Sequence, residues 1–218
     1  MSPLVRLRPA LAEDIATMVV ALNDACQDSP FHNRCFPPGD PASEQYLVGR
    51  IQKNLADPAS HLVVAEEAGT GSTATSGAPP IAGWARWVRR PCPAPDAKPA
   101  PPPVLTEDMY PAGGDAALAA RFFQANHDAM ARATKDQPVW FLSIIIVPKG
   151  HQRRGVGSEL MRFGVDKADR EGWAAYVNGS PEGKALYERF GFRTVQRSDF
   201  GGGIVTDHMK REAKQSSP

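Results

Sequence analysis

The residues best suited to chemistry lie in one short run, Gln152-Arg153-Arg154-Gly155-Val156-Gly157, which follows an apolar stretch that ends at Pro148. Glycine lets the main chain approach a ligand closely. If a helix begins here, its first amide groups have no partners within the helix, and together with the helix dipole they favour a phosphate group. Lys149 and His151 add positive charge. The run therefore predicts a site for a phosphate-bearing cofactor, and a pyrophosphate fits it best.

Two common phosphate-binding motifs do not fit this run. A P-loop needs a lysine after its second glycine, but Val156 follows Gly155 at that place. The dinucleotide-binding fingerprint needs a third glycine, which Leu160 replaces. A nucleotide-binding protein of either kind is therefore disfavoured.

A second block lies further along the chain, NGSPEGKALYERFGF at 178–192. The Gln-x-x-Gly-x-Gly run after a strand resembles the acyl-CoA-binding motif of the GNAT N-acetyltransferase superfamily, and the second block resembles the later motif of that superfamily. The pattern Ser-Pro-x-Gly, Leu-Tyr, Gly-Phe is most similar to fungal members. Order and spacing of the two blocks agree with the resemblance.

The resemblance implies a GNAT fold of the α/β (α+β) class, with a mixed, mostly antiparallel sheet of about seven strands and helices on both faces. The fourth and fifth strands would be splayed apart, and the pantetheine arm of acetyl-CoA would lie between them. Acetyl-CoA is then the implied co-substrate, and no metal is expected.

The same resemblance assigns cofactor contacts. The main chain of Ile145, Ile146 and Val147 would bind the pantetheine arm. Asn178, Ser180 and Gly183 would lie near its sulfur end, beside Tyr187. The pyrophosphate would be held by the amides of the glycine turn, namely those of Gln152, Arg153, Arg154, Gly155, Val156, Gly157 and Ser158.

Tyr187 is the residue that we expect to act in catalysis. Acetyl transfer from a thioester needs a neutral amine, a stabilised oxyanion and a proton for the leaving thiolate. A phenol with a pKa of about 10 can protonate a thiolate whose conjugate acid has a pKa of about 8.5. Tyr187 aligns with the tyrosine that the superfamily uses as this acid. The amide of Ile145 is our candidate for holding the oxyanion.

The base that would take the proton of the amine is not evident, because the strand at 140–147 contains no carboxylate and Ser143 is its only polar side chain. Some relatives place a glutamate on this strand. The remaining candidates stay open: water, or one of Glu107, Asp108, His127, Asp128 and His208.

Three residues are candidates for contact with the acceptor. In the superfamily, the region between the first two helices commonly lines the acceptor site, and here it contains Phe31 and His32. Trp87, on the expected third strand, is the third candidate, with packing in the core as the alternative.

Hydrophobic periodicity predicts the elements that position these residues. Strands are expected at 4–8, 61–67, 81–89, 140–147, 173–177, 192–196 and 204–209. Helices are expected at 12–28, 43–55, 115–134, 155–171 and 181–190, with a loop at 29–41. Asp115 is suited to cap the third of these helices, and Gly172 to end the fourth.

Length and composition favour one domain over residues 1–218, with three irregular segments. Residues 68–80 predict a flexible hairpin tip, 90–114 a proline-rich insertion and 212–218 a frayed tail. The net charge of +1 gives no electrostatic case for nucleic acid. No apolar run approaches the ~20 residues that a membrane helix needs. Three cysteines without metal-binding spacing favour a reduced, cytoplasmic protein, with the nucleus as an alternative.

The sequence thus predicts an acyl-CoA-dependent N-acyltransferase that transfers acetyl directly to an amine within a ternary complex. The acceptor is a small-molecule amine or an amine of a peptide or protein, and the chain is a monomer or a homodimer. The alternative is a CoA-binding regulatory or interaction protein without turnover.

Overall fold

The computed structural model describes residues 5–67, 81–93, 101–135 and 137–214. Seven strands occur in the described part: β1 Val5–Pro9, β2 Ser60–Glu67, β3 Ile81–Arg90, β4 Val139–Ile146, β5 Ala174–Gly179, β6 Arg193–Asp199 and β7 Val205–Arg211. The α-helices described there are α1 Ile15–Ala25, α2 Pro30–Cys35, α3 Pro41–Ala56, α4 Ala116–Thr134, α5 Val156–Glu171 and α6 Lys184–Arg189.

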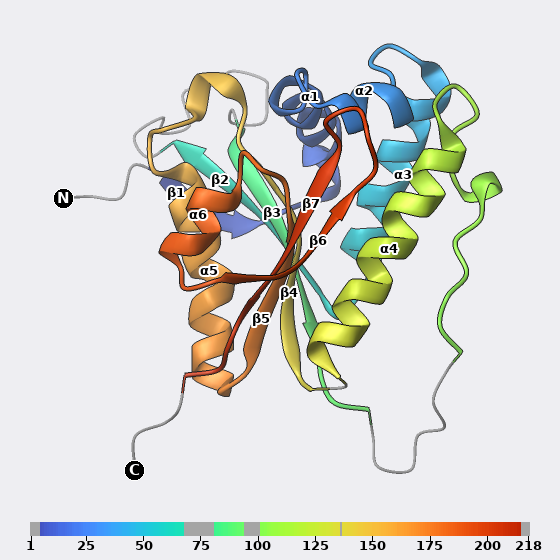
Figure 1. Ribbon diagram of the computed structural model, residues 1–218. Coiled ribbons are helices and arrows are strands. Elements are labelled where there is room, and N and C mark those ends of the chain that lie inside the picture. Colours follow the sequence, from blue (N-terminus) through green and yellow to red (C-terminus); the bar gives the residue numbers. More distant parts are fainter. Residues whose placement is uncertain (1–4, 68–80, 94–100, 136, 215–218) are drawn as a thin grey trace.

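The strands form one mixed sheet in the order β1-β2-β3-β4-β5-β7-β6. Every neighbouring pair is antiparallel except β4 and β5, which are parallel. Helices α5 and α6 cover one face of the sheet, while α1, α3 and α4 cover the other (Figure 1). This arrangement confirms the predicted GNAT fold.

Two tryptophans of β3 attach helices to opposite faces of the sheet. Trp84 donates from Nε1 to the carbonyl oxygen of Met18 in α1, at 3.1 Å. Trp87 donates from Nε1 to the carbonyl oxygen of Leu160 in α5, also at 3.1 Å. Because side chains alternate along a strand, these tryptophans face opposite ways. The sheet is therefore held between two fixed layers of helix.

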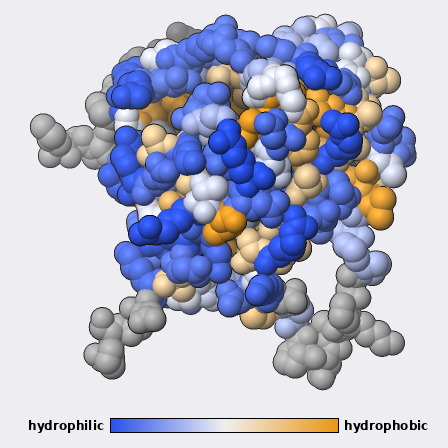
Figure 2. Space-filling model, viewed as in Figure 1, coloured by the Kyte–Doolittle hydropathy of each residue, from blue (hydrophilic) through white to orange (hydrophobic). Residues whose placement is uncertain are grey.

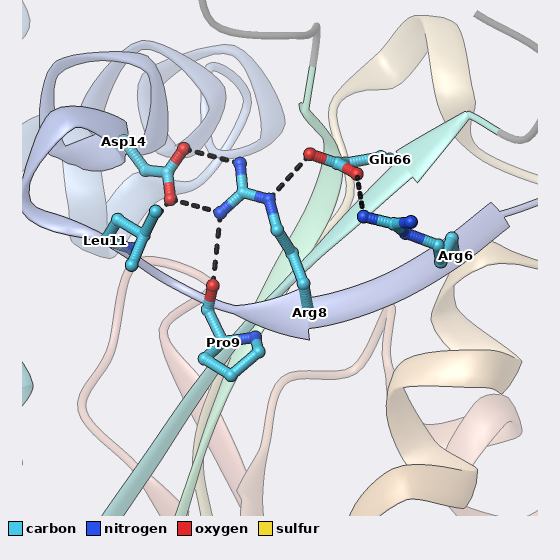
Figure 3. A network of polar contacts seen from close by, with 6 residues as sticks. All are labelled: Arg6, Arg8, Pro9, Leu11, Asp14 and Glu66. Carbon is cyan, nitrogen blue, oxygen red and sulfur yellow. Dashed lines mark hydrogen bonds and ion pairs between the residues drawn. The ribbon is translucent and has the colours of Figure 1, made fainter. Parts of the chain in front are cut away.

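A buried ion pair ties the edge strand β1 to α1 (Figure 3). The guanidinium of Arg8 binds both oxygens of Asp14, at 2.6 and 2.8 Å, and its Nε binds Glu66 of β2 at 2.6 Å. The hydrogen bond from Arg8 holds the pKa of the buried Asp14 carboxyl below its usual value. A buried charge is tolerated only when it is paired in this way.

Most expected elements are present, with boundaries shifted by a few residues. The Asp115 carboxylate accepts a hydrogen bond from the Leu118 amide, at 2.9 Å, which confirms the predicted cap of α4. Gly172 ends α5 with φ of +67°. The prediction of a loop over 29–41 was wrong in part, because α2 forms there.

The irregular segments are tested only in part. The expected hairpin tip at 68–80 lies outside the described residues, as do 94–100 of the proline-rich insertion and 215–218 of the tail. Within that insertion, residues 101–106 have no regular structure, and Glu107–Met109 form a single 3₁₀ turn. None of the helices in the described part is long and apolar enough to cross a bilayer.

Candidate active site

The strands β4 and β5 separate at the centre of the sheet. Their pairing ends with Leu142 opposite Val177, and beyond it β5 continues to pair only with β7. At the same point Ser143 of β4 has no residue opposite it in β3, which makes it a β-bulge. A bulge bends the strand that carries it. From Ser143 onward, the edge of β4 that faced β5 therefore has no strand partner among the described residues.

The glycine turn follows directly from the free end of β4. Arg153 has φ of +61° and Gly155 has φ of +87°, and alternation of right- and left-handed backbone of this kind forms a concave nest of amides. Among the described residues, the amides from Arg153 to Gly157 have no main-chain acceptor. The Gln152 side chain donates to the Val147 carbonyl oxygen at 3.0 Å, which attaches the turn to the end of β4.

Three of the basic side chains of this turn contact carboxylates of the protein itself, which the sequence did not indicate. Arg154 and His151 both contact the Glu67 carboxylate, at 2.9 and 3.3 Å, and Lys149 pairs with Asp28. Arg153 is exposed and forms no ion pair within the described part of the chain. The attraction for an anion therefore comes mainly from main-chain amides and from Arg153.

Tyr187 of α6 lies on the α5 side of the sheet, at the end of β5. A Cβ atom added to Gly179 or Gly183 would come within 2.8 Å of its ring or hydroxyl, so both glycines leave the space that the ring occupies. The side chain is 5% exposed. Burial, and then the charge of Glu182, raise the pKa of the Tyr187 phenol. The hydroxyl therefore remains protonated and can donate a proton.

A pocket of about 140 Å³ lies at the same end of β5, and the Asn178 side chain is part of its lining. Its walls come from α2, α4, the turn after β5, and the start of β7: Ser29, Pro30, Phe31, Phe122, Gly179, Ser180, Pro181, Glu182, Gly203, Ile204, Val205 and Thr206. Phe122 and Glu182 were not predicted as site residues. A larger cavity, of about 330 Å³, lies by β1, β2 and Phe163, at the edge of the sheet away from the splay.

Of the three residues predicted to contact the acceptor, one lines the pocket and two are buried away from it. Phe31 lines the pocket and stacks on Phe122, with ring centroids 3.8 Å apart. His32 is buried behind it, with Nε2 3.0 Å from Asn23 Oδ1, and burial lowers its pKa. Trp87 is fully buried under α5. Its contacts are those of a core residue, and we leave it out of the acceptor site proposed below.

Among the candidate bases, only His208 lies next to the pocket. Its Nδ1 is 2.8 Å from the Asn178 side-chain oxygen, and its Nε2 is 2.8 Å from Ser198 Oγ. Tyr176 also donates to the Asn178 oxygen, at 3.2 Å. His208 is fully buried, and desolvation followed by the charge of Arg132 lowers its pKa. This group fixes the Asn178 amide in place.

The other candidate bases lie away from the splay. His127 and Asp128 contact one another on α4, at 3.3 Å. Glu107 and Asp108 are in the exposed turn before that helix. Across the part of the chain that the structure describes, no group of three or more His, Cys, Asp or Glu side chains is placed to hold a metal ion.

The sheet is thus splayed at its parallel pair and followed by an amide-lined turn, which is the arrangement expected of a GNAT fold. Residues 116–213 match the family model described as acetyltransferase (GNAT) domain. Residues 116–213 thus match a GNAT acetyltransferase domain, and the chain as a whole has the GNAT fold.

Solved structures support the same fold. The chain resembles a histone acetyltransferase HPA2 and related acetyltransferase from Corynebacterium glutamicum, with a TM-score of 0.60, 20% identity, and coverage of 99% of this chain and 100% of that one. It also resembles yncA from Salmonella typhimurium, a putative acetyltransferase solved with acetyl-CoA, with a TM-score of 0.53, 15% identity, and coverage of 99% and 98%. At 20% and 15% identity, the similarity shows a shared fold and does not identify the acceptor.

Proposed function

We propose that this protein is an acetyl-CoA-dependent N-acetyltransferase that transfers acetyl directly to a primary amine. The observation that carries the proposal is the convergence of three features at one end of β5: the splay, the amide nest and the buried Tyr187. A phosphate-binding turn alone would fit many proteins, but the adjoining unpaired edge of β4 fits an extended amide-bearing arm.

The residues present fit acetyl-CoA. The amides from Arg153 to Gly157 would hold its pyrophosphate, because they lack acceptors among the described main chain and lie at the start of a helix. Ile145, Ile146 and Val147 would bind the pantetheine arm through main-chain groups. Bound acetyl-CoA would supply an activated acetyl group: a C–N bond to the neutral amine would form, the C–S bond would break, the nitrogen would lose one proton and the sulfur would take one.

The protein provides that proton and positions the amine. Tyr187 would donate from its hydroxyl to the sulfur, since burial keeps the phenol protonated. The pocket lined by Phe31, Phe122 and Asn178 would hold the amine on the opposite face of the sheet. Asn178 points to that side, because its side chain contacts Tyr176 and His208, whereas a side chain at the next residue, Gly179, would meet Tyr187. The amide of Ile145 remains our candidate for the oxyanion.

The cofactor site can be tested with two matched substitutions in the same turn. A Cβ at Gly157, in the first turn of α5, would lie 3.2 Å from the Leu186 side chain, whereas Gly150 has open space around it. Gly157→Glu should abolish measurable acetyl-CoA binding by steric and charge conflict, while Gly150→Glu should weaken it by less than about tenfold, because an exposed charge is screened. Isothermal titration calorimetry measures both. Equal affinity in the two variants would show that the pyrophosphate binds elsewhere.

The alternative is a CoA-binding protein without turnover. The absence of a carboxylate on β4 favours it, while the enclosed position of Tyr187 favours an enzyme. Release of CoA thiol that depends on an added amine distinguishes the two.

A further inference from the structure

The pocket at the end of β5 is small and aromatic on one side. Phe31 and Phe122 stack within it, and Phe122 also contacts Phe200, with ring centroids 5.1 Å apart. The volume of about 140 Å³ is close to that of an engineered cavity of about 150 Å³ that accommodates benzene. The pocket therefore has room for about one ring, and its aromatic wall offers a face for that ring.

Glu182 also lines this pocket and brings negative charge to it. It is exposed, and within the described residues no cation lies in ion-pair range of its carboxylate. After burial, its charge is the second cause that raises the pKa of both Cys26, to about 11, and Tyr187. A Cβ at the next residue, Gly183, would lie 2.8 Å from the Tyr187 hydroxyl, so Glu182 stands beside the hydroxyl that we assign to catalysis.

The remaining polar groups of the lining are uncharged. Ser29, Asn178, Ser180 and Thr206 contribute hydroxyls and one amide. An amine with one charge would have a partner in Glu182, whereas each further ammonium group of a polyamine would be placed among aromatic rings without a counter-ion, which costs free energy.

We propose, on the basis of the function proposed above, that the acceptor is a small primary amine with a single positive charge and one ring-sized apolar group. Its ammonium group lies at Glu182, next to Tyr187, and its ring lies against Phe31 and Phe122. Glu182 supplies the carboxylate that β4 lacks. It holds the ammonium group beside the reacting centre, where the amine loses its proton to water before attack.

The first test is a binding experiment in the wild-type protein saturated with CoA, so that it does not depend on turnover. Calorimetry compares 2-phenylethylamine with n-butylamine, spermidine and a short peptide that contains one lysine. We expect 2-phenylethylamine to bind about tenfold more tightly than n-butylamine, from its aromatic contacts, and more tightly than spermidine or the peptide. Comparable or stronger binding of n-butylamine, spermidine or the peptide would overturn the proposal.

Variants then assign the contacts. Phe122→Leu should weaken 2-phenylethylamine about tenfold and leave n-butylamine nearly unchanged. Glu182→Gln should weaken both amines by about fivefold at low salt, as expected for a partly exposed ion pair. Glu188→Gln is the matched control, because Glu188 is exposed on α6, the helix that follows Glu182, and does not line the pocket. An effect of Glu188→Gln equal to that of Glu182→Gln would contradict the role of Glu182.

Measurement of thiol release separates this proposal from the proposed function. Tight binding of 2-phenylethylamine without thiol release from acetyl-CoA would support the ligand class and contradict the reaction. Thiol release with spermidine or the lysine peptide, but none with 2-phenylethylamine, would overturn the ligand class and leave the reaction standing.

Discussion

Tyr187 owes its position to two residues that have no side chain. Gly179 ends β5 and Gly183 precedes α6, and a methyl group on either would overlap the tyrosine ring or its hydroxyl. The ring is thereby held at the end of β5 with its hydroxyl against the main chain. The motif predicted the tyrosine and Gly183 from sequence alone, but the fit of Gly179 to the ring follows only from the folded geometry.

The Tyr187 hydroxyl can be removed without changing the shape of the ring. We expect Tyr187→Phe to lower kcat about 100-fold, since general acid catalysis typically contributes at least this much. The affinity for acetyl-CoA should stay within about twofold, because the contacts that bind the ground state are kept. Steady-state kinetics and calorimetry measure the two quantities. A variant with unchanged kcat would remove Tyr187 from the mechanism.

Charged residues of the glycine turn could not be interpreted fully from sequence. The spacing indicated that four basic side chains face a ligand, yet His151 and Arg154 contact Glu67, which is more than 80 residues earlier in the chain. Glu182 was overlooked for the opposite reason. It stands within the second motif, but its place in the pocket depends on Phe31 and Phe122 from distant segments.

At the scale of elements, the long helices and the strands could be predicted because each carries a sustained apolar pattern. Helix α2 could not, since its six residues are too few to show a helical period. Its local signals were present: Ser29 caps it, with the Ser29 Oγ accepting from the His32 amide, and Pro30 occupies its first turn. The bulge at Ser143 also has no sequence signature.

The contact of α5 with β3 gives a prediction at this scale. Gly164 of α5 lies directly on the Trp87 ring, and a Cβ atom there would overlap it. Gly164→Ala should destabilise the protein by about 1–3 kcal/mol, the usual cost of overpacking a core. Gly49→Ala in α3 is the control, because nothing lies within 4 Å of that position. It should stabilise the protein by about 0.5–1 kcal/mol through helix propensity.

Urea unfolding monitored by circular dichroism measures both changes. Equal stability of the two glycine variants would show that α5 does not approach Trp87 as closely as the structure indicates. A stabilised Gly164→Ala variant would contradict the packing of α5 on β3 altogether.

At the scale of the whole molecule, the pocket that we propose for the acceptor depends on segments that lie far apart in the sequence. Phe31, Phe122 and Ile204 meet only because α2, α4 and the β6–β7 turn converge beside the end of β5. The face shown in Figure 2 is mostly hydrophilic, with apolar surface in separate patches rather than in one band. Family resemblance predicted the fold, and it predicted an acceptor site near Phe31, but it did not predict the shape of the pocket.

Two buried histidines, His32 and His208, and the partly buried His61 also give the whole molecule a pH dependence. Burial lowers the pKa of His32, His61 and His208 in the folded state, whereas the unfolded value is about 6.5. Below about pH 6.5 the unfolded chain therefore binds more protons, and stability falls as pH decreases toward the lowered values. Above that pH these residues cause little change of stability with pH.

We expect Tm to be lower at about pH 5.5 than at about pH 7.5, by roughly 3 °C for each kcal/mol lost. Differential scanning calorimetry at constant ionic strength measures the shift. A Tm that is unchanged or higher at the lower pH would contradict the neutral, buried state of these histidines.

The most direct test of the central claim is mass spectrometry of the products formed from acetyl-CoA and 2-phenylethylamine, with released thiol measured in the same samples. The account predicts N-acetylated amine and free CoA in equal amounts, with both abolished in Gly157→Glu. If acetyl-CoA binds but neither this amine nor any other primary amine yields an acetylated product, the protein is not an N-acetyltransferase, and the CoA-binding alternative would replace it.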